Sequence, residues 1–133
     1  MSKIIATITQ IKNVQSLNIV DFDFKGTPLT MMSLDLASNI VVGGRVELSV
    51  KPTHLAIVKD FAGEFSYSNQ IKATIVTIEK GELISSITLK VHDVLLQSII
   101  TTKSTQRMNL QTEDDVTIFF KASELSILEV LND

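Results

Sequence analysis

The sequence predicts an all-β protein made of two tandem, five-stranded, OB-like β-barrels with short helical turns. Ile, Val, Leu and Thr are abundant, and the β-branched residues in this group favour strands. Apolar and polar side chains alternate with a period of two along most segments, as in strands with one buried face. One order of strands occurs twice, with about five short strands each time, which is typical of a small OB-like barrel.

The repeat is clearest where each copy begins. Residues 4–11 align with residues 71–78, and five of the eight positions are identical. The second copy later gains three residues, and the match then continues so that Lys51 corresponds to Lys121. This ordered set of matches indicates a duplicated unit.

The duplication divides the 133-residue chain into two small units. We expect a degenerate first unit at residues 1–60 and a second unit at residues 65–133, with a short linker at residues 59–65. A unit of this size buries too little surface to be stable alone, so we expect the two units to stabilise each other.

The strands of each unit follow from the alternation and from the turns between them. Residues 20–24 alternate strictly, with acidic side chains on the wet face, and residues 87–91 repeat this pattern. Lys25-Gly26-Thr27-Pro28 predicts a hairpin turn after the first of these segments, and His92-Asp93 stands in the matching place. The expected strands lie at residues 4–11, 20–24, 29–32 and 46–50 in the first unit, and at residues 71–78, 87–91, 94–100 and 116–120 in the second.

Two further segments complete the pattern. Residues 104–109 predict a short capped helical turn, and residues 36–40 are its counterpart in the first unit. Residues 128–131 fit either an added strand or a frayed end, and the sequence leaves both interpretations open.

Composition and charge exclude several classes of function. A net charge of −3 and an isoelectric point near 5.3 argue against a nucleic-acid surface, which needs a basic face. The absence of cysteine excludes disulfides and thiol catalysis and suits a reducing cytoplasm. Residues 1–5 lack the apolar core of a signal peptide, and no apolar run reaches the length of a membrane helix, so we expect no membrane association.

Two strand ends carry the same polar pattern. The apolar strand at residues 116–120 is followed by Lys121 and Ser123, and the strand at residues 46–50 by Lys51 and Thr53. A lysine, a hydroxyl and the backbone N–H groups of a turn are the donors needed to hold a small oxyanion. Residues 66–70 add hydroxyls, an amide and further N–H groups just before a strand; a Ser/Asn-rich linker end is the alternative interpretation.

These segments resemble a known family. Ser-Tyr-Ser-Asn-Gln-Ile-Lys-Ala at residues 66–73 is similar to the Ser-Ala-Arg-Asn-Gln-Leu-Lys-Gly opening of the molybdate-binding Mop domain, a TOBE-type module. Residues 78–81 resemble the next turn of that family, and residues 121–124 its closing Lys-Ala-Ser signature. The resemblance is strong from residue 66 to about residue 128 and weaker over residues 3–59, so the whole chain resembles the tandem-Mop molbindins.

The resemblance implies a fold, a ligand and an assembly. Mop units are OB-like barrels that pair, often by exchanging strands, and assemble around a threefold axis. Molybdate or tungstate binds between units as a ligand, with no covalent cofactor and no metal cation held directly by the protein. Carried over by position, the oxyanion-binding residues are Ser66, Tyr67, Ser68 and Asn69 from one unit, Lys121, Ala122 and Ser123 from a neighbour, and Lys51 and Thr53 in the first unit.

The chain also departs from the family pattern. The family's arginine is Ser68 here, which removes a charged donor; such a hydrogen bond contributes roughly 1.5–3 kcal/mol, or one to two orders of magnitude in affinity. The first unit has no Ser-Ala-Arg-Asn segment, and Pro52 has no N–H to match that of Ala122. We therefore expect fewer working sites than two complete repeats would supply.

Other polar residues favour structural roles. His54 and His92 have no carboxylate at metal-ligand spacing, and residues 113–115 fit a solvated turn better than a calcium loop. The sequence shows no Ser-His-Asp arrangement and no phosphate-binding loop, so no enzymatic activity is expected.

The leading hypothesis is a cytoplasmic homo-oligomer, with a trimer of two-unit chains favoured, that binds molybdate or tungstate for storage, homeostasis or sensing. The alternative is a regulatory or interaction module with a weakened or vestigial oxyanion site. A third interpretation, a single-stranded nucleic-acid binder on an OB barrel, is disfavoured because the chain has one Tyr, no Trp and an acidic balance.

Overall fold

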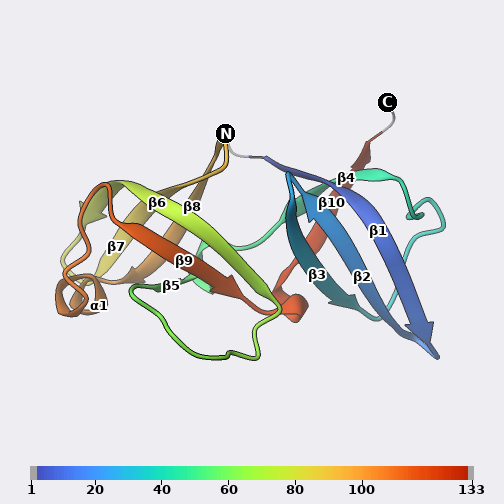
Figure 1. Ribbon diagram of the computed structural model, residues 1–133, viewed down its shortest axis with the longest axis horizontal. Helices are drawn as coiled ribbons and strands as arrows, with labels where there is room; N and C mark the ends of the chain where they lie inside the picture. Colours follow the sequence, from blue (N-terminus) through green and yellow to red (C-terminus); the bar gives the residue numbers. More distant parts are fainter. Residues whose placement is uncertain (1–2, 132–133) are drawn as a thin grey trace.

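A computed structural model describes residues 3–131 as two curled, five-stranded sheets that lie side by side (Figure 1). The strand order is β10-β4-β1-β2-β3 in the first sheet and β5-β9-β6-β7-β8 in the second. Neighbouring strands are antiparallel throughout both sheets. The predicted all-β class with two five-stranded units is confirmed.

Each half of the chain supplies four strands of its own sheet. In the first half these are β1 (Ile4–Val14), β2 (Leu17–Phe24), β3 (Thr27–Ser33) and β4 (Arg45–Ser49). In the second half they are β6 (Asn69–Lys80), β7 (Ile84–Val91), β8 (Val94–Thr101) and β9 (Asp115–Phe120). The helical elements are the 3-10 turns η1 (Pro52–His54) and η2 (Ala122–Glu124) and the short helix α1 (Thr102–Arg107).

The fifth strand of each sheet comes from the other half of the chain. β5 (Ala56–Val58) follows η1 and pairs with β9 of the second sheet. β10 (Ser126–Leu131) follows η2 and pairs with β4 of the first sheet. The C-terminal segment is thus an added strand, and the strand exchange that the family resemblance implied between units occurs here within one chain.

Equivalent irregularities mark the duplication. The β1–β2 pairing shifts register between Ile8 and Gln10, and the β6–β7 pairing shifts between Ile75 and Thr77. The two shifts fall at matching positions of the sequence repeat, in which Ile8 aligns with Ile75. A β-bulge bends a strand and increases its twist, so the shared bulge explains why both sheets curl in the same way.

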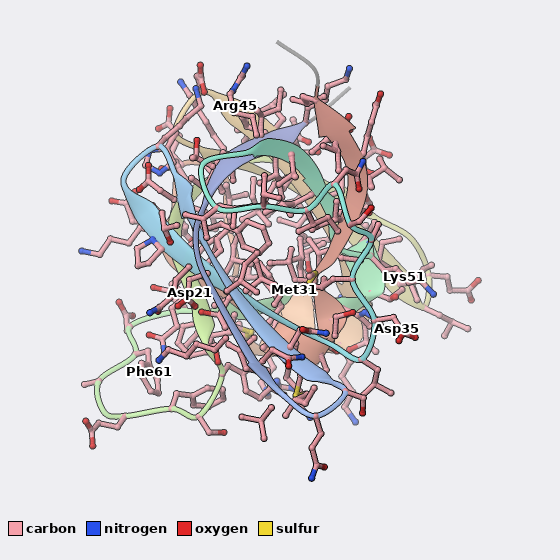
Figure 2. The ribbon with its side chains drawn as sticks, turned by 90° about the vertical axis from the view of Figure 1, so that its right-hand side faces the viewer. Asp21, Met31, Asp35, Arg45, Lys51 and Phe61 are labelled. Atoms are coloured by element: carbon pink, nitrogen blue, oxygen red, sulfur yellow. The ribbon has the colours of Figure 1, made fainter. Side chains whose placement is uncertain are left out.

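The buried face of each sheet follows the predicted alternation. Val20, Phe22 and Phe24 of β2 are at most 1% exposed, and their counterparts Ile87, Leu89 and Val91 of β7 are fully buried. Fully burying such a side chain contributes about 1.5–3 kcal/mol. One continuous core runs through both sheets, and Figure 2 shows Met31 inside the curl of the first sheet.

The helical turns differ between the halves. The helix predicted at residues 104–109 begins earlier, at Thr102, because Thr101 Oγ1 accepts a hydrogen bond from the Ser104 N–H at 3.1 Å and caps it. Residues 36–40, the expected counterpart, form only a turn closed by the Ile40 N–H and the Ala37 carbonyl. The first copy is three residues shorter here, which leaves too little chain for a helical turn with its flanking connections.

The two sheets also meet through their hairpin turns. Lys25 forms an ion pair with Asp93 at 2.7 Å, and Thr27 Oγ1 lies 2.8 Å from His92 Nε2. The hydrogen bond from Lys25 lowers the pKa of Asp93 below its usual value. Within residues 3–131, no helix has the length and apolar character needed to cross a membrane.

Candidate functional site

Strand pairing brings together the two best-matched polar segments of the sequence. β6 begins at Asn69 and β9 ends at Phe120, and these two residues pair across the antiparallel ladder. Residues 66–68, which precede β6, therefore lie beside residues 121–123, which follow β9. The family resemblance implied that a neighbouring unit supplies the second segment, whereas here both segments come from one unit.

The turn after β9 leaves hydrogen-bond donors available. The Lys121 N–H donates to Glu124 Oε1, and the Glu124 N–H donates to the Lys121 carbonyl, both at 2.9 Å. These two bonds close η2 as a compact turn. Among the hydrogen bonds of residues 3–131, none uses the N–H of Ala122 or Ser123, as expected for the first residues of a helical turn.

An aromatic cluster fixes the segment that precedes β6. Phe61 and Phe65 pack edge-on against Phe119, with ring centroids 5.4 and 4.7 Å apart. Tyr67 in turn packs against Phe65 at 4.8 Å. The Lys121 ammonium lies 5.4 Å from the centre of the Tyr67 ring, a distance at which a cation is attracted to the ring face. The loop and the lysine turn are thus held next to each other.

Asn69 joins this unit to the first sheet. Its side chain is fully buried; the amide Nδ2 donates to the Thr30 carbonyl at 2.9 Å and Oδ1 accepts the Thr30 N–H at 2.7 Å. Thr30 lies on β3, the edge strand of the first sheet, so Asn69 satisfies backbone groups that no neighbouring strand pairs. A buried amide with both ends bonded in this way holds the two sheets in register at the site.

The result is a pocket of about 380 Å³ between the two sheets. One side consists of Ser66, Tyr67, Ser68, Lys121, Ala122 and Ser123, and the other consists of Ile19, Thr30 and Met32 of β2 and β3. Six of the nine predicted site residues therefore line one cavity. Asn69 is not among the lining residues, because its amide is committed to Thr30.

Lys51 and Thr53, the other predicted site residues, lie elsewhere. They belong to the η1 turn, which packs against β8 of the second sheet. Figure 2 shows Lys51 on the opposite side of the molecule from Phe61, whose loop leads to Ser66. The groove beside η1, of about 610 Å³, is lined mainly by apolar side chains, among them Leu55, Leu95 and Leu128. Their roles as oxyanion ligands stay a prediction.

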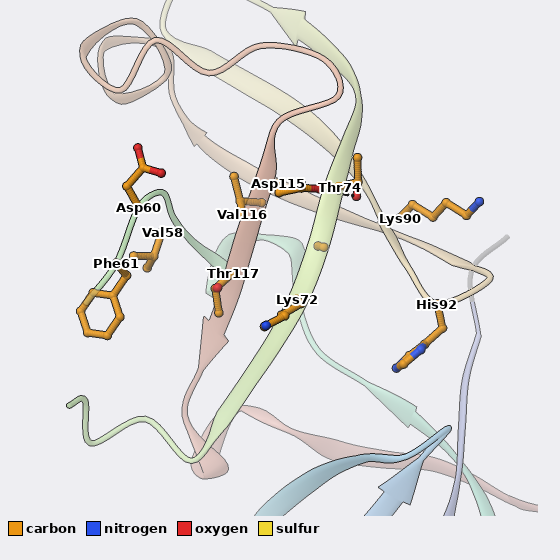
Figure 3. A pocket seen from close by; sticks show the side chains of 11 residues that line it. Val58, Asp60, Phe61, Lys72, Thr74, Lys90, His92, Asp115, Val116 and Thr117 are labelled. Carbon is orange, nitrogen blue, oxygen red and sulfur yellow. Dashed lines mark hydrogen bonds between the residues drawn. The ribbon is translucent and has the colours of Figure 1, made fainter. Parts of the chain in front are cut away.

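A larger pocket, of about 650 Å³, lies on the second sheet (Figure 3). Its cationic side chains, Lys72 and Lys90, extend in different directions, and the carboxylates of Asp60 and Asp115 share the lining. Asp115 also accepts a hydrogen bond from Thr74 Oγ1 at 3.1 Å. Dispersed cations next to carboxylates suit a small dianion poorly, so the pocket between the two sheets is the better candidate.

The second half of the chain matches a known domain family. Residues 66–127 match the TOBE domain family. The second unit is a TOBE domain. The matched range begins at Ser66 and includes Lys121 to Ser123, so both polar segments that line one side of the pocket belong to the TOBE domain. The predicted TOBE-type resemblance is confirmed.

Solved structures extend the comparison to the whole chain. The cytoplasmic molybdate-binding protein ModG, in a crystal form with molybdate bound, has 21% sequence identity and a TM-score of 0.88; the match covers 94% of this chain and 93% of ModG. The chain, including its first unit, thus shares the fold of ModG. A molybdate-binding protein from Sporomusa ovata has 30% identity over 50% of this chain and 100% of its own, with a TM-score of 0.49. No curated protein sequence matches the chain.

Sequence reasoning missed the side of the pocket that lies outside the TOBE domain. Ile19, Thr30 and Met32 are ordinary strand residues, and nothing in their local pattern indicates a site. Their place in the pocket depends on how β3 docks against η2 and Asn69, a contact between segments far apart in the chain. The contact becomes visible only in the structure, where the Asn69 side chain is buried against Thr30.

Proposed function

We propose that this chain binds molybdate or tungstate in the pocket between its two sheets, for storage, homeostasis or sensing of the anion. The observation that carries the proposal is the convergence of Ser66–Ser68 and Lys121–Ser123 on one cavity. The TOBE domain and the fold shared with molybdate-bound ModG support the same ligand class. The proposed function is binding, with no catalytic step.

The donors of the pocket fit a tetrahedral dianion. Lys121 supplies one full positive charge, the N–H groups of Ala122 and Ser123 supply directed donors, and the hydroxyls of Ser66, Ser68 and Ser123 complete the set. Hydrogen bonds from a charged donor are stronger than neutral ones. Because Ser68 stands where the Mop family has arginine, we expect an affinity roughly one to two orders of magnitude below that of a site with both cations.

Titration calorimetry tests the proposal directly. The chain is titrated with molybdate, tungstate and sulfate at equal ionic strength, since salt screens the charge of Lys121. Saturable heat with molybdate or tungstate, and weaker heat with the smaller sulfate, is the expected result. No heat with either metal oxyanion at high protein concentration would contradict the proposed function.

The proposal extends to the assembly and the setting of the protein. We propose repeated units at residues 1–60 and 65–133 with their last strands exchanged, and a cytoplasmic homo-oligomer, most simply a trimer of two-unit chains. Leu34, Val42 and Leu83 are exposed apolar side chains that an interface between chains would cover. Native mass spectrometry with added molybdate counts subunits and bound anions together; a monomer with and without the anion would contradict the assembly.

A further inference from the structure

The two 3-10 turns of the duplicated unit meet each other between the sheets. His54 ends η1 and Glu124 ends η2, and they occupy equivalent positions of the repeat. His54 Nδ1 lies 3.8 Å from Glu124 Oε2. The duplication has thus placed a base opposite an acid at the contact between its two halves, and Glu124 directly follows Ser123 of the candidate anion pocket.

A neutral His54 ring leaves one of its nitrogens without a hydrogen-bond partner. His54 Nδ1 is buried and has no hydrogen-bond partner among residues 3–131. At 3.8 Å the carboxylate of Glu124 is too far for a good hydrogen bond but close enough for an ion pair. Protonation of His54 gives the buried nitrogen a counter-ion within reach, whereas the neutral ring leaves it unsatisfied.

The acid side of the contact belongs to the anion-binding turn. Glu124 accepts the Lys121 N–H through Oε1, so its carboxylate is fixed close to Ala122 and Ser123, which precede it in the turn. A fixed negative charge beside an anion pocket opposes binding, and a positive charge next to it removes part of that opposition. Protonation of His54 therefore changes the net charge beside the pocket, because it offsets the charge of Glu124.

The strands that make the main contacts with the two turns carry no ionisable side chain. η1 packs against β8 and η2 against β3, and no residue of either strand is ionisable. Lys51 precedes η1 and Lys121 precedes η2, and lysines keep their charge across the neutral range. Histidine is the side chain that ordinarily changes charge between pH 5 and 8.

We propose that His54 is a positioning residue for the oxyanion pocket: protonated His54 neutralises Glu124 across the contact between η1 and η2 and thereby strengthens anion binding at Lys121–Ser123. This inference rests on the proposed function of that pocket. By linkage, the effect is reciprocal, so a bound dianion favours protonation of His54 by the same factor. Anion affinity is then higher at pH 6 than at pH 8, because histidine is the side chain that ordinarily changes charge in this range.

Calorimetric affinities for molybdate at pH 8 and pH 6 test the inference in four proteins. We expect the unmodified chain to bind roughly fivefold more tightly at pH 6, the size of one screened charge interaction near a protein surface. His54→Gln should bind at both pH values as weakly as the unmodified chain at pH 8. Glu124→Gln keeps an oxygen for the Lys121 N–H but loses the charge, and should bind tightly at both.

His92→Gln is the matched control, because His92 is the only other histidine in the chain and contacts Thr27, away from the pocket. It should keep the full pH dependence, and changes in the anion itself affect all four proteins equally. A pH dependence that persists in His54→Gln would overturn the inference and leave the proposed function standing. Absence of molybdate heat from the unmodified chain would overturn both.

Discussion

The two lysine turns have the same place in the duplicated fold but different surroundings. After β9, Lys121 leads into a turn with N–H donors at Ala122 and Ser123, beside a serine-rich segment and a wall from the other sheet. After β4, Lys51 leads into Pro52, which has no N–H, beside an apolar groove. A shared backbone therefore supplies the position of a site, while a few side chains decide whether it has donors.

The strands that end in these turns also differ in how their outer faces are covered. Phe119 of β9 is covered by the loop that carries Phe61 and Phe65, whereas its counterpart in β4 is Ser49, whose side of the sheet forms the open groove. The aromatic cover holds Ser66 to Ser68 near the pocket. In the second unit, a sheet face that is open in the first unit thus packs against the loop and holds the binding segment in place.

The largest expected effect concerns this aromatic cover. Phe119 is 1% exposed, and replacing a buried Phe by Ala removes about 3–5 kcal/mol of unfolding free energy. Phe119→Ala should also weaken molybdate binding, because the loop loses its anchor. Ser49→Ala, the matched change in the first unit, should cost less than about 0.5 kcal/mol. Urea unfolding measures both, and equal effects would mean that the two faces do not differ as described.

Asn69 gives the next largest effect. Asn69→Ala leaves the Thr30 N–H and carbonyl without partners at a part-buried contact, which costs about 1–3 kcal/mol. Gln70→Ala, next in the chain and exposed, is the control and should change the unfolding free energy little. If both variants unfold at the same urea concentration as the unmodified chain, the Asn69–Thr30 contact does not hold the sheets together.

Replacing each lysine in turn tests which of the two turns binds the anion. Lys121→Met removes the one full charge of the pocket and should weaken molybdate binding roughly 10- to 100-fold, the equivalent of a charge-assisted hydrogen bond. Lys51→Met makes the same change in net charge and should shift the affinity less than about threefold. Calorimetry on both variants decides the matter, and a larger loss in Lys51→Met would assign the working site to η1.

A smaller difference lies in the turns before β4 and β9. Gly43 has φ +89° and its counterpart Glu113 has φ +71°, a region that costs a residue with a Cβ about 1–2 kcal/mol. Gly43→Ala should therefore destabilise the protein by about 1 kcal/mol, whereas Glu113→Gly should leave it unchanged or slightly more stable. Thermal unfolding of both variants measures the contrast, and a loss of stability in Glu113→Gly would contradict it.

The smallest effect is a pH dependence of stability at the turn before β9. Asp114 accepts the Gln111 N–H at 2.9 Å and pairs with Lys59 at 3.1 Å, and these contacts, the first above all, lower its pKa below the usual value. A lowered carboxyl pKa adds stability above the unfolded value, and this stability is lost as the pH falls through the folded value. Asp114→Asn should thus lower the urea midpoint at pH 6, and the difference from the unmodified chain should shrink in acid.

Gly44 stands in the equivalent place of the first unit and has no carboxylate, so the turn before β4 has no counterpart of this acid-sensitive contact. Hydrogen exchange of the Gln111 amide, measured as the pH is lowered, shows whether the loss of stability begins at this turn. A urea difference that keeps the same size down to the acid limit would show that Asp114 acts through packing and not through its charge.

Much of the fold was predictable because its causes are local. Alternation in β2 and β7 assigns the buried face residue by residue, and the repeat of Ile4–Ile11 at Ile71–Ile78 predicts a second copy of whatever the first one forms. The helix at Thr102 was predicted two residues late, since its start depends on the side chain of Thr101. The expected helical turn at residues 36–40 was wrong, because the shorter loop closes as a turn.

The candidate site likewise has residues that the sequence indicates and residues that only the structure reveals. Ser66 to Ser68 and Lys121 to Ser123 stand out in the sequence as donor-rich strand ends, and their convergence follows from one strand pairing. Ile19 and Met32 have no such signal, because an apolar strand residue looks the same whether it lines a cavity or a surface. Their role follows from the docking of one sheet on the other.

By itself, the sequence determined the strands, the duplication and the polar character of two strand ends, since these depend on a residue's nearest neighbours in the chain. Tertiary structure decided which sheet β5 and β10 join, that the Asn69 amide bonds to the backbone of an edge strand, and that, of the two lysine turns, the one at Lys121 shares a pocket with Ser66 and Ser68. The physical reason is that an unpaired sheet edge accepts any strand that reaches it. Which strand arrives depends on the packing of the whole molecule.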